Sequence, residues 1–145
     1  MAKKRRRKPK RPETMSCNVE ISSIRPRVSL SMHDAEGPEP GVDSHCGLRL
    51  RGTMDMSIRG VRDMELRLWA DWNHHIGPNR PAYIGYITHT RPEVSVIASC
   101  RPADFEYLWS LALSGELKFA YLSFTKPHYG SADVLDMAFS NEAEE

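Results

Sequence analysis

The sequence predicts a mainly β domain, either an antiparallel β-sandwich or a strongly bent antiparallel sheet of about eight strands, with one amphipathic helix at 102–114. Short runs of alternating apolar and polar residues recur at intervals of about ten residues along 15–140, the spacing of all-β folds. A helical period occurs in only one segment, which leaves too few helices for a parallel α/β sheet. With 145 residues, the chain has the length of one domain.

The predicted strands follow from this alternation and from the residues that interrupt it. In the first run Cys17, Val19 and Ile21 alternate with polar neighbours, and we expect Pro26 to separate this run from the next. Gly52 predicts a bulge or bend within a long strand. Glycine, proline and acidic residues predict an exposed loop at 34–44. The expected strands are 15–24, 28–32, 46–58, 64–72, 82–90, 93–99, 117–122 and 132–139.

The predicted helix begins at Pro102, a residue that suits the first helical position, and carries Asp104 in its first turn. Gly115 is expected to end it. Apolar residues at spacings of three and four predict a stripe that packs on the core: Phe105, Leu108, Trp109, Ala112 and Leu113. Trp69, which lies on the side of its strand opposite to Leu66 and Leu68, is the better candidate for a surface contact.

Charge divides the chain sharply at residue 12. Residues 1–12 contain no acidic residue, and the remaining 133 residues hold twelve basic and nineteen acidic ones, a formal charge of −7. Like charges and two prolines predict that 1–14 is a disordered basic tail ahead of one β-rich domain at 15–140, with a frayed acidic end at 141–145. The tail holds eight basic residues: Lys3, Lys4, Arg5, Arg6, Arg7, Lys8, Lys10 and Arg11.

The tail predicts binding to RNA or DNA. Eight cationic side chains can neutralise several phosphates and displace their counterions, which gives sequence-independent and salt-sensitive affinity. The same residues also match the composition of a nuclear localisation signal, and they could instead form a solvated tail. The sequence suggests no basic patch within the body, so we expect the tail alone to hold nucleic acid.

One loop suggests a metal site. Asp71, His74, His75 and His89 carry ligand types that zinc and manganese take, and Asp55 could approach from another strand. Consecutive histidines in extended chain point to opposite sides, which argues against a shared ion. A metal-dependent hydrolase or nuclease is therefore kept as the alternative function.

A Cys-His nucleophile pair is disfavoured at His45 and Cys46, since neighbours in a strand face opposite sides. Phosphate-binding glycine motifs and cofactor motifs are absent from the sequence, so we expect no cofactor. Three separated cysteines without a CxxC pair predict free thiols. The chain has no apolar run of bilayer length and no secretory signal, so we expect an intracellular protein, cytoplasmic or nuclear, that is not secreted and does not bind membranes.

These observations predict a non-enzymatic binding or assembly module. Its basic tail would tether it to nucleic acid, while the β domain contacts a protein partner or itself. A regulatory protein that the tail targets to the nucleus is a further alternative.

Overall fold

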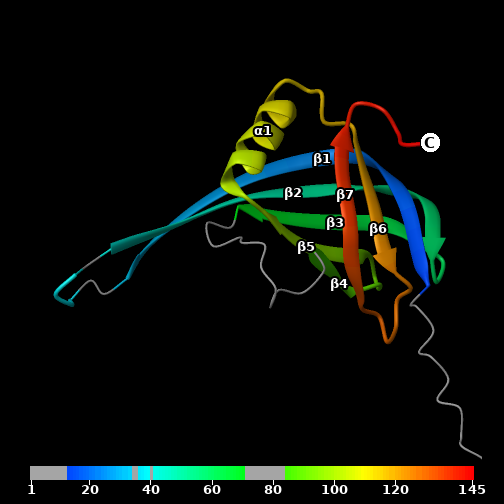
Figure 1. Cartoon of the computed structure of the whole chain (residues 1–145), viewed down its shortest axis with the longest axis horizontal. Helices are drawn as coiled ribbons and strands as arrows, with labels where there is room; N and C mark the ends of the chain where they lie inside the picture. The colour runs from blue at the N-terminus through cyan, green and yellow to red at the C-terminus, as the bar shows by residue number, and fades with distance from the viewer. Residues whose placement is uncertain (1–12, 34–35, 40, 71–83) are drawn as a thin grey trace, which may run out of the picture.

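The computed structural model describes residues 13–33, 36–39, 41–70 and 84–145. In these residues one helix and seven strands occur, and the strands close into a barrel in the order β1-β2-β3-β5-β4-β7-β6. The mainly β class with a single helix is therefore confirmed. The elements are β1 (Thr14–His33), β2 (Gly41–Ile58), β3 (Val61–Ala70), β4 (Gly85–His89), β5 (Val94–Cys100), α1 (Pro102–Leu113), β6 (Phe119–Thr125) and β7 (Ala132–Ser140) (Figure 1).

The predicted sandwich is wrong, because β1 joins the two ends of the sheet. Residues 14–20 of β1 pair with β6, and residues 19–33 pair with β2. β1 therefore closes the barrel, because it pairs with β6 at its beginning and with β2 from Val19 onward. The expectation of an all-antiparallel arrangement also fails at one place, where β3 and β5 run parallel.

Two of the expected strands are one, because Pro26 does not interrupt β1. From Ser23 onward β1 pairs with β2 alone, since its pairing with β6 ends at Glu20. A strand with one free side does not need every backbone N–H in a ladder, so it accommodates proline.

A bulge between Ile21 and Ser23 changes which residues of β1 face the core. Before the bulge the odd-numbered Cys17 and Val19 are buried, and after it the even-numbered Ile24 is paired with buried Leu50. The irregularity predicted at Gly52 therefore lies in the strand that pairs with it. Gly52 itself is required by close approach, because a Cβ atom there would lie 2.3 Å from the carbonyl oxygen of Glu20.

The core fills the barrel and extends under α1. Its most deeply buried side chains include Met54, Ile87, Leu122 and Phe124. The helix ends one residue before the predicted boundary and buries Phe105 and Leu108 in the same core cluster. Leu113 is 75% exposed, so the predicted stripe does not extend to the last helical residue.

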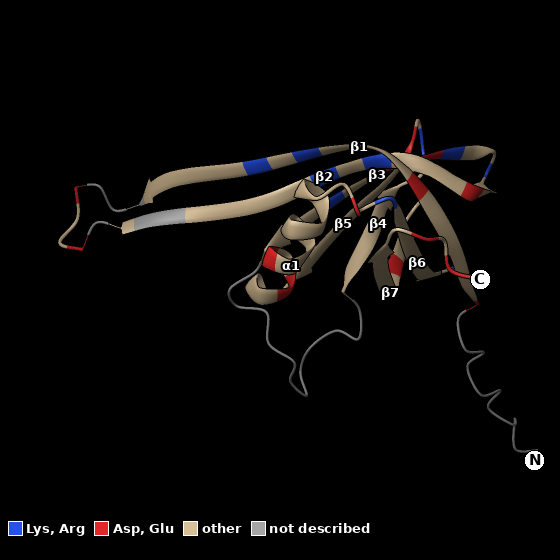
Figure 2. Ribbon diagram, turned by 90° about the horizontal axis from the view of Figure 1, so that it is seen from above, with Lys and Arg blue, Asp and Glu red and all other residues tan. Residues whose placement is uncertain are grey.

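β1 and β2 continue beyond the barrel as a two-stranded ribbon. Residues 28–33 pair with 41–46, and neither segment has a third strand beside it. This ribbon, together with the exposed turn at 36–39, is called the arm. Six residue pairs correspond to a projection of about 20 Å, and Figures 1 and 2 show the arm standing clear of the other strands.

The two ends of the described chain lie against strands of the barrel. The backbone N–H of Lys126 donates to the carbonyl of Glu13, ahead of β1. In the acidic segment 141–145, for which the sequence predicts fraying, the backbone of Glu144 exchanges two hydrogen bonds with the side chain of Asn18. Within the described part of the chain, no helix has the length and apolar character to cross a membrane.

Candidate functional site

Five arginines from three adjacent strands lie on the outer surface of the barrel at the base of the arm. β2 turns Leu48 and Leu50 into the core, so the intervening Arg49 and Arg51 point outward. Figure 2 shows basic positions gathered on β1, β2 and β3 in this region. We call this set the arginine face: Arg25 and Arg27 on β1, Arg49 and Arg51 on β2, and Arg67 on β3.

The strand register places three of these arginines in one row. Arg49 lies directly opposite Arg25 on one side and directly opposite Arg67 on the other. Side chains in directly opposed positions are close neighbours, and like charges there repel each other. The row therefore needs negative charge nearby.

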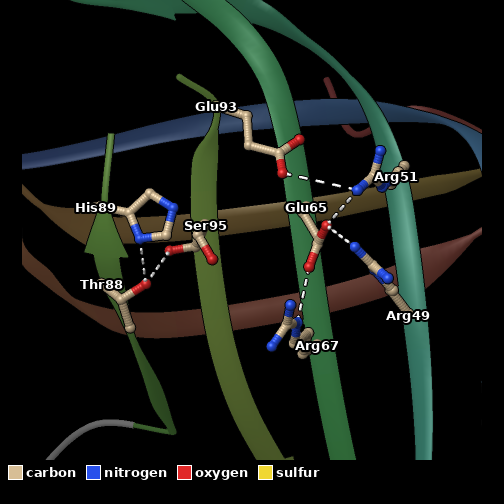
Figure 3. A network of polar contacts seen from close by, with 8 residues as sticks. All are labelled: Arg49, Arg51, Glu65, Arg67, Thr88, His89, Glu93 and Ser95. Carbon is tan, nitrogen blue, oxygen red and sulfur yellow. Dashed lines mark hydrogen bonds and ion pairs between the residues drawn. The ribbon is translucent and has the colours of Figure 1, made fainter. Parts of the chain in front are cut away.

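Glu65 supplies part of that charge from the middle of the face (Figure 3). Its carboxylate accepts hydrogen bonds from Arg49 at 2.8 Å, Arg51 at 2.9 Å and Arg67 at 2.7 Å. The Glu65 side chain is only 3% exposed although it belongs to the outer surface, because the arginine side chains cover it. Glu93 adds a longer contact, 3.9 Å from Arg51.

The arginines keep Glu65 ionised. Burial raises the pKa of this carboxyl, but the hydrogen bonds from Arg49, Arg67 and Arg51 outweigh that effect and lower its pKa to about 2. The hydrogen bond between Arg49 and Glu65 also raises the pKa of Arg49. The cluster is thus permanently charged over the whole range in which proteins function.

The carboxylates do not balance the face. Five arginines against Glu65 and Glu93 leave three net positive charges. Arg25 and Arg27 are exposed and form no ion pair with another described residue. The buried Nε–H of Arg49 also lacks an acceptor within the described structure. Unused donors and uncompensated charge therefore remain on the side of the face that is nearest to the arm.

A groove of about 300 Å³ lies on this side of the face. Four arginines line it, Arg25, Arg27, Arg49 and Arg67, together with Trp69. Trp69 lies directly opposite Gly47, and a Cβ atom at Gly47 would be 2.8 Å from the indole Cε3. The glycine therefore leaves room for the ring against the strand. A smaller hollow of about 130 Å³ shares Arg25 and Arg49 and extends to Arg51.

This arrangement provides fixed positive charge, guanidinium donors and one aromatic ring. Guanidinium groups bind phosphate oxygens through charge-assisted hydrogen bonds, and aromatic rings stack on unpaired bases. The face thus combines charged hydrogen-bond donors with one aromatic ring at the edge of a groove.

The expectation that the body has no basic patch is wrong. The arginines are spread over 43 positions of the sequence, and only the pairing of β1, β2 and β3 brings them together. A signal was present in the Arg-x-Arg pairs at 25 and 27 and at 49 and 51, since residues two apart in a strand share a face. Trp69, predicted as a surface contact, is half-buried and lines the groove.

The predicted tail and most of the predicted metal site lie outside the described residues. These are the eight basic residues of 3–11 and Asp71, His74 and His75. His89 is exposed on β4, where its Nδ1 atom lies 3.1 Å from the hydroxyl of Thr88 (Figure 3). Asp55 on β2 instead accepts a hydrogen bond from the backbone N–H of Asn18 on β1. Of the described side chains, no three His, Cys, Asp or Glu form a metal-binding group.

The cysteines show no nucleophilic arrangement in the described structure. Cys46 pairs with Val28 and His45 with Ser29, so the two point to opposite faces of the arm, as the sequence predicts. Burial raises the pKa of Cys17 to about 12 and that of Cys100 to about 11, with smaller contributions from nearby aspartates. Both thiols are therefore protonated and unreactive at neutral pH.

A second hollow, of about 350 Å³, lies between α1 and the strands β3, β5 and β7. Its lining is mostly apolar, including Leu68, Leu111 and Phe139, and its charged groups Arg101 and Asp104 are paired with each other at 2.9 Å. This hollow offers less to a charged ligand than the arginine face does.

Comparison with known proteins gave no match to a family model, to a curated protein or to a solved structure.

Proposed function

We propose that the chain is a non-enzymatic binding module that holds RNA or DNA by its phosphate backbone. The arginine face is the folded part of the site, and the basic tail at 3–11 is a second, sequence-independent contact. The β domain also contacts a protein partner or itself. The observation that carries the proposal is the row of Arg25, Arg49 and Arg67, whose like charges lie side by side while two of them share the Glu65 carboxylate.

A structural role alone explains only part of this face. Arg49, Arg51 and Arg67 hold Glu65 and so have a function within the fold. Arg25 and Arg27 have no such described partner, and Arg25 adds repulsion by facing Arg49. A bound phosphate would relieve that repulsion, as it would bring negative charge to the open side of the row.

The groove favours a single strand over a duplex. Unpaired bases can enter a hollow beside the backbone contacts and stack on Trp69, whereas paired bases are not available for stacking. One stacked base contributes about 1–3 kcal/mol in sites of this kind, with little dependence on its identity. The affinity would therefore be largely independent of sequence.

The acidic charge of the body does not oppose this binding. At physiological ionic strength, charges separated by more than about 8 Å are screened from each other, so the local charge of the face matters more than the total. The acidic regions would repel the backbone elsewhere and confine it to the face and the tail.

Salt dependence of binding tests the proposal most directly. The full chain is titrated with a fluorescent single-stranded oligonucleotide and with a duplex at several salt concentrations. Replacing Arg25 and Arg27 by alanine should weaken binding and lower the slope of log K against log salt by about one for each phosphate that is no longer neutralised. A variant with all eight basic tail residues replaced by serine separates the contribution of the tail.

The matched control removes two cations from elsewhere on the barrel. Lys118 and Lys126 are exposed and flank β6 in the sequence. Their replacement by alanine removes two positive charges, as R25A/R27A does. If this control weakens binding as much as R25A/R27A, or if neither does, the arginine face is not the site. The proposal would also be contradicted if the purified protein binds no oligonucleotide at low salt and its ultraviolet absorbance shows no bound nucleic acid that a high-salt wash removes.

A further inference from the structure

An exposed aromatic side chain lies on the outer surface of the barrel beyond the arginine face. Tyr86, on β4, is 45% exposed. Its neighbours Gly85 and Ile87 are buried, so the tyrosine points away from the core. A single exposed ring is common on protein surfaces. The residues around Tyr86 therefore decide whether it has a function.

The strand register places Tyr86 in the same row as the arginines. Arg67 on β3 lies directly opposite Ile97 on β5, and Ile97 lies directly opposite Tyr86 on β4. Because directly opposed residues of paired strands point to the same side of a sheet, Tyr86 shares a side with Arg67. In Figure 3 the strands β2, β3, β5 and β4 lie side by side. The row that begins with the arginines thus reaches β4.

The strand between Arg67 and Tyr86 adds no charge to this side of the sheet. On β5 the outward positions are held by Ser95, Ile97 and Ser99, which are uncharged. A nucleic-acid strand that leaves the arginines can therefore cross β5 without burying a charged side chain, which would cost free energy.

The row ends in negative charge. Tyr86 lies directly opposite Asp133 on β7, which is exposed. At the other end, on β1, the row begins with Arg25. A phosphate backbone is attracted to the arginine end and repelled at the aspartate end. The position of Tyr86 therefore suits a base at the end of a bound strand, and its ring offers a stacking surface in place of a cation.

We propose that Tyr86 is a second base-stacking residue and that a single strand of nucleic acid crosses the barrel from β1 to β4. The arginines hold the phosphates, Trp69 stacks on one base and Tyr86 stacks on another. The two aromatic residues lie two strands and two residues apart, about 12 Å along the sheet, so they hold different bases. This inference rests on the proposed function and adds the path of the strand.

The dependence of affinity on oligonucleotide length tests this path. The full chain is titrated with fluorescent oligothymidylates and oligouridylates of increasing length, which compares DNA with RNA. Y86A should weaken the binding of long oligonucleotides roughly tenfold, because one stacked base is lost. The shortest oligonucleotides, which the arginines hold and which do not reach β4, should bind Y86A and the wild-type chain equally. Y86F keeps the ring and should retain the wild-type affinity.

Salt dependence and an abasic strand separate stacking from other effects of the substitution. Y86A should leave the slope of log K against log salt unchanged, because Tyr86 neutralises no phosphate, whereas R25A/R27A lowers it. A strand without bases should bind Y86A and the wild-type chain equally. Weaker binding of Y86A to the abasic strand as well would show that the substitution disturbs the face, and it would overturn the role in stacking.

Y107A is the matched control. Tyr107 is 72% exposed and lies on α1, outside the row, so its replacement should leave the affinity unchanged. If Y86A binds long oligonucleotides as the wild-type chain does, or if Y107A weakens binding equally, the inference fails while the arginine face stands. A wild-type chain that binds no oligonucleotide at low salt overturns the proposed function and this inference together.

Photocross-linking of the wild-type chain needs no substitution. An oligonucleotide that carries iodouracil in place of thymine is bound at low salt and irradiated, and the linked peptides are identified by mass spectrometry. Cross-links to both Trp69 and Tyr86 are expected. Cross-links to Trp69 without any to Tyr86, at every position of the iodouracil in a long strand, would exclude the path to β4.

Discussion

Replacement of Glu65 by glutamine should destabilise the fold, because it removes the negative charge of a carboxylate that accepts hydrogen bonds from three arginines. The pKa of Glu65 falls from 4.5 to about 2 in the folded chain. One pKa unit corresponds to about 1.4 kcal/mol, so the ionised carboxylate contributes about 3 kcal/mol to the free energy of unfolding. The arginines are 40–50% exposed, and screening by solvent makes this value an upper bound.

The pH dependence gives this prediction its specific signature. The folded state has the lower pKa, so it binds fewer protons than the unfolded state between the two values. The stabilisation is therefore complete above pH 4.5 and is lost as the pH falls towards 2. The difference in stability between the wild-type chain and E65Q should shrink from about 3 kcal/mol at pH 7 to about 1 kcal/mol at pH 3.

Urea unfolding at pH 7, 5, 4 and 3, followed by tryptophan fluorescence, measures this difference. E93Q is the matched control, because Glu93 lies at the same face but its one ion pair among the described residues is a long one, 3.9 Å to Arg51, and its side chain is 30% exposed. It should change stability by less than about 0.5 kcal/mol. A stability difference between wild type and E65Q that stays constant with pH would refute the role assigned to the carboxylate.

The same variant should bind nucleic acid more tightly while it is less stable. Loss of the Glu65 charge leaves the arginine face with one more net positive charge, so the affinity for an oligonucleotide and its salt dependence should both increase. Opposite changes in stability and affinity distinguish a functional face from a purely structural ion-pair network. A loss of affinity in folded E65Q would indicate that the arginines must be held by Glu65 in order to bind.

Three further predictions concern the barrel. Phe124 is fully buried, so Phe124→Ala should lower the free energy of unfolding by about 3–5 kcal/mol, measured in urea. Gly52→Ala should cost about 1–3 kcal/mol, because the added Cβ atom meets the carbonyl of Glu20; an unchanged urea midpoint would show that β1 and β2 separate easily there. Cys17 and Cys100, with raised pKa values, should react with iodoacetamide at pH 8 much more slowly in the folded chain than in urea, as mass spectrometry can show.

Local patterns in the sequence are sufficient to predict most individual elements. The helix follows from Pro102 and the spacing of Phe105 and Leu108, and the structure places it there. Val28, Leu30 and Met32 share one side of a strand, as their alternation predicts. These features depend on neighbours that are close in the chain.

Closure of the barrel and assembly of the arginine face depend on pairings that are distant in sequence. Nothing near Thr14 in the sequence shows that it pairs with Thr125, so a sandwich and a barrel could not be distinguished. Similarly, the burial of Glu65 results from arginines on a neighbouring strand, and its alternation alone predicts a solvent-exposed residue. Register between strands, which is set by the whole core, decides both.

The length of β1 has a mechanical consequence. One uninterrupted strand forms the seam with β6 at its beginning and the arm at its end, so the two regions share a backbone across the bulge near Ser22. A ligand or subunit that binds the arm and fixes its twist and register should therefore also stabilise the pairing of β1 with β6. By the same coupling, a change in that pairing should alter binding at the arm. Amide exchange along 14–20 should therefore report events at the arm, on the opposite end of the strand.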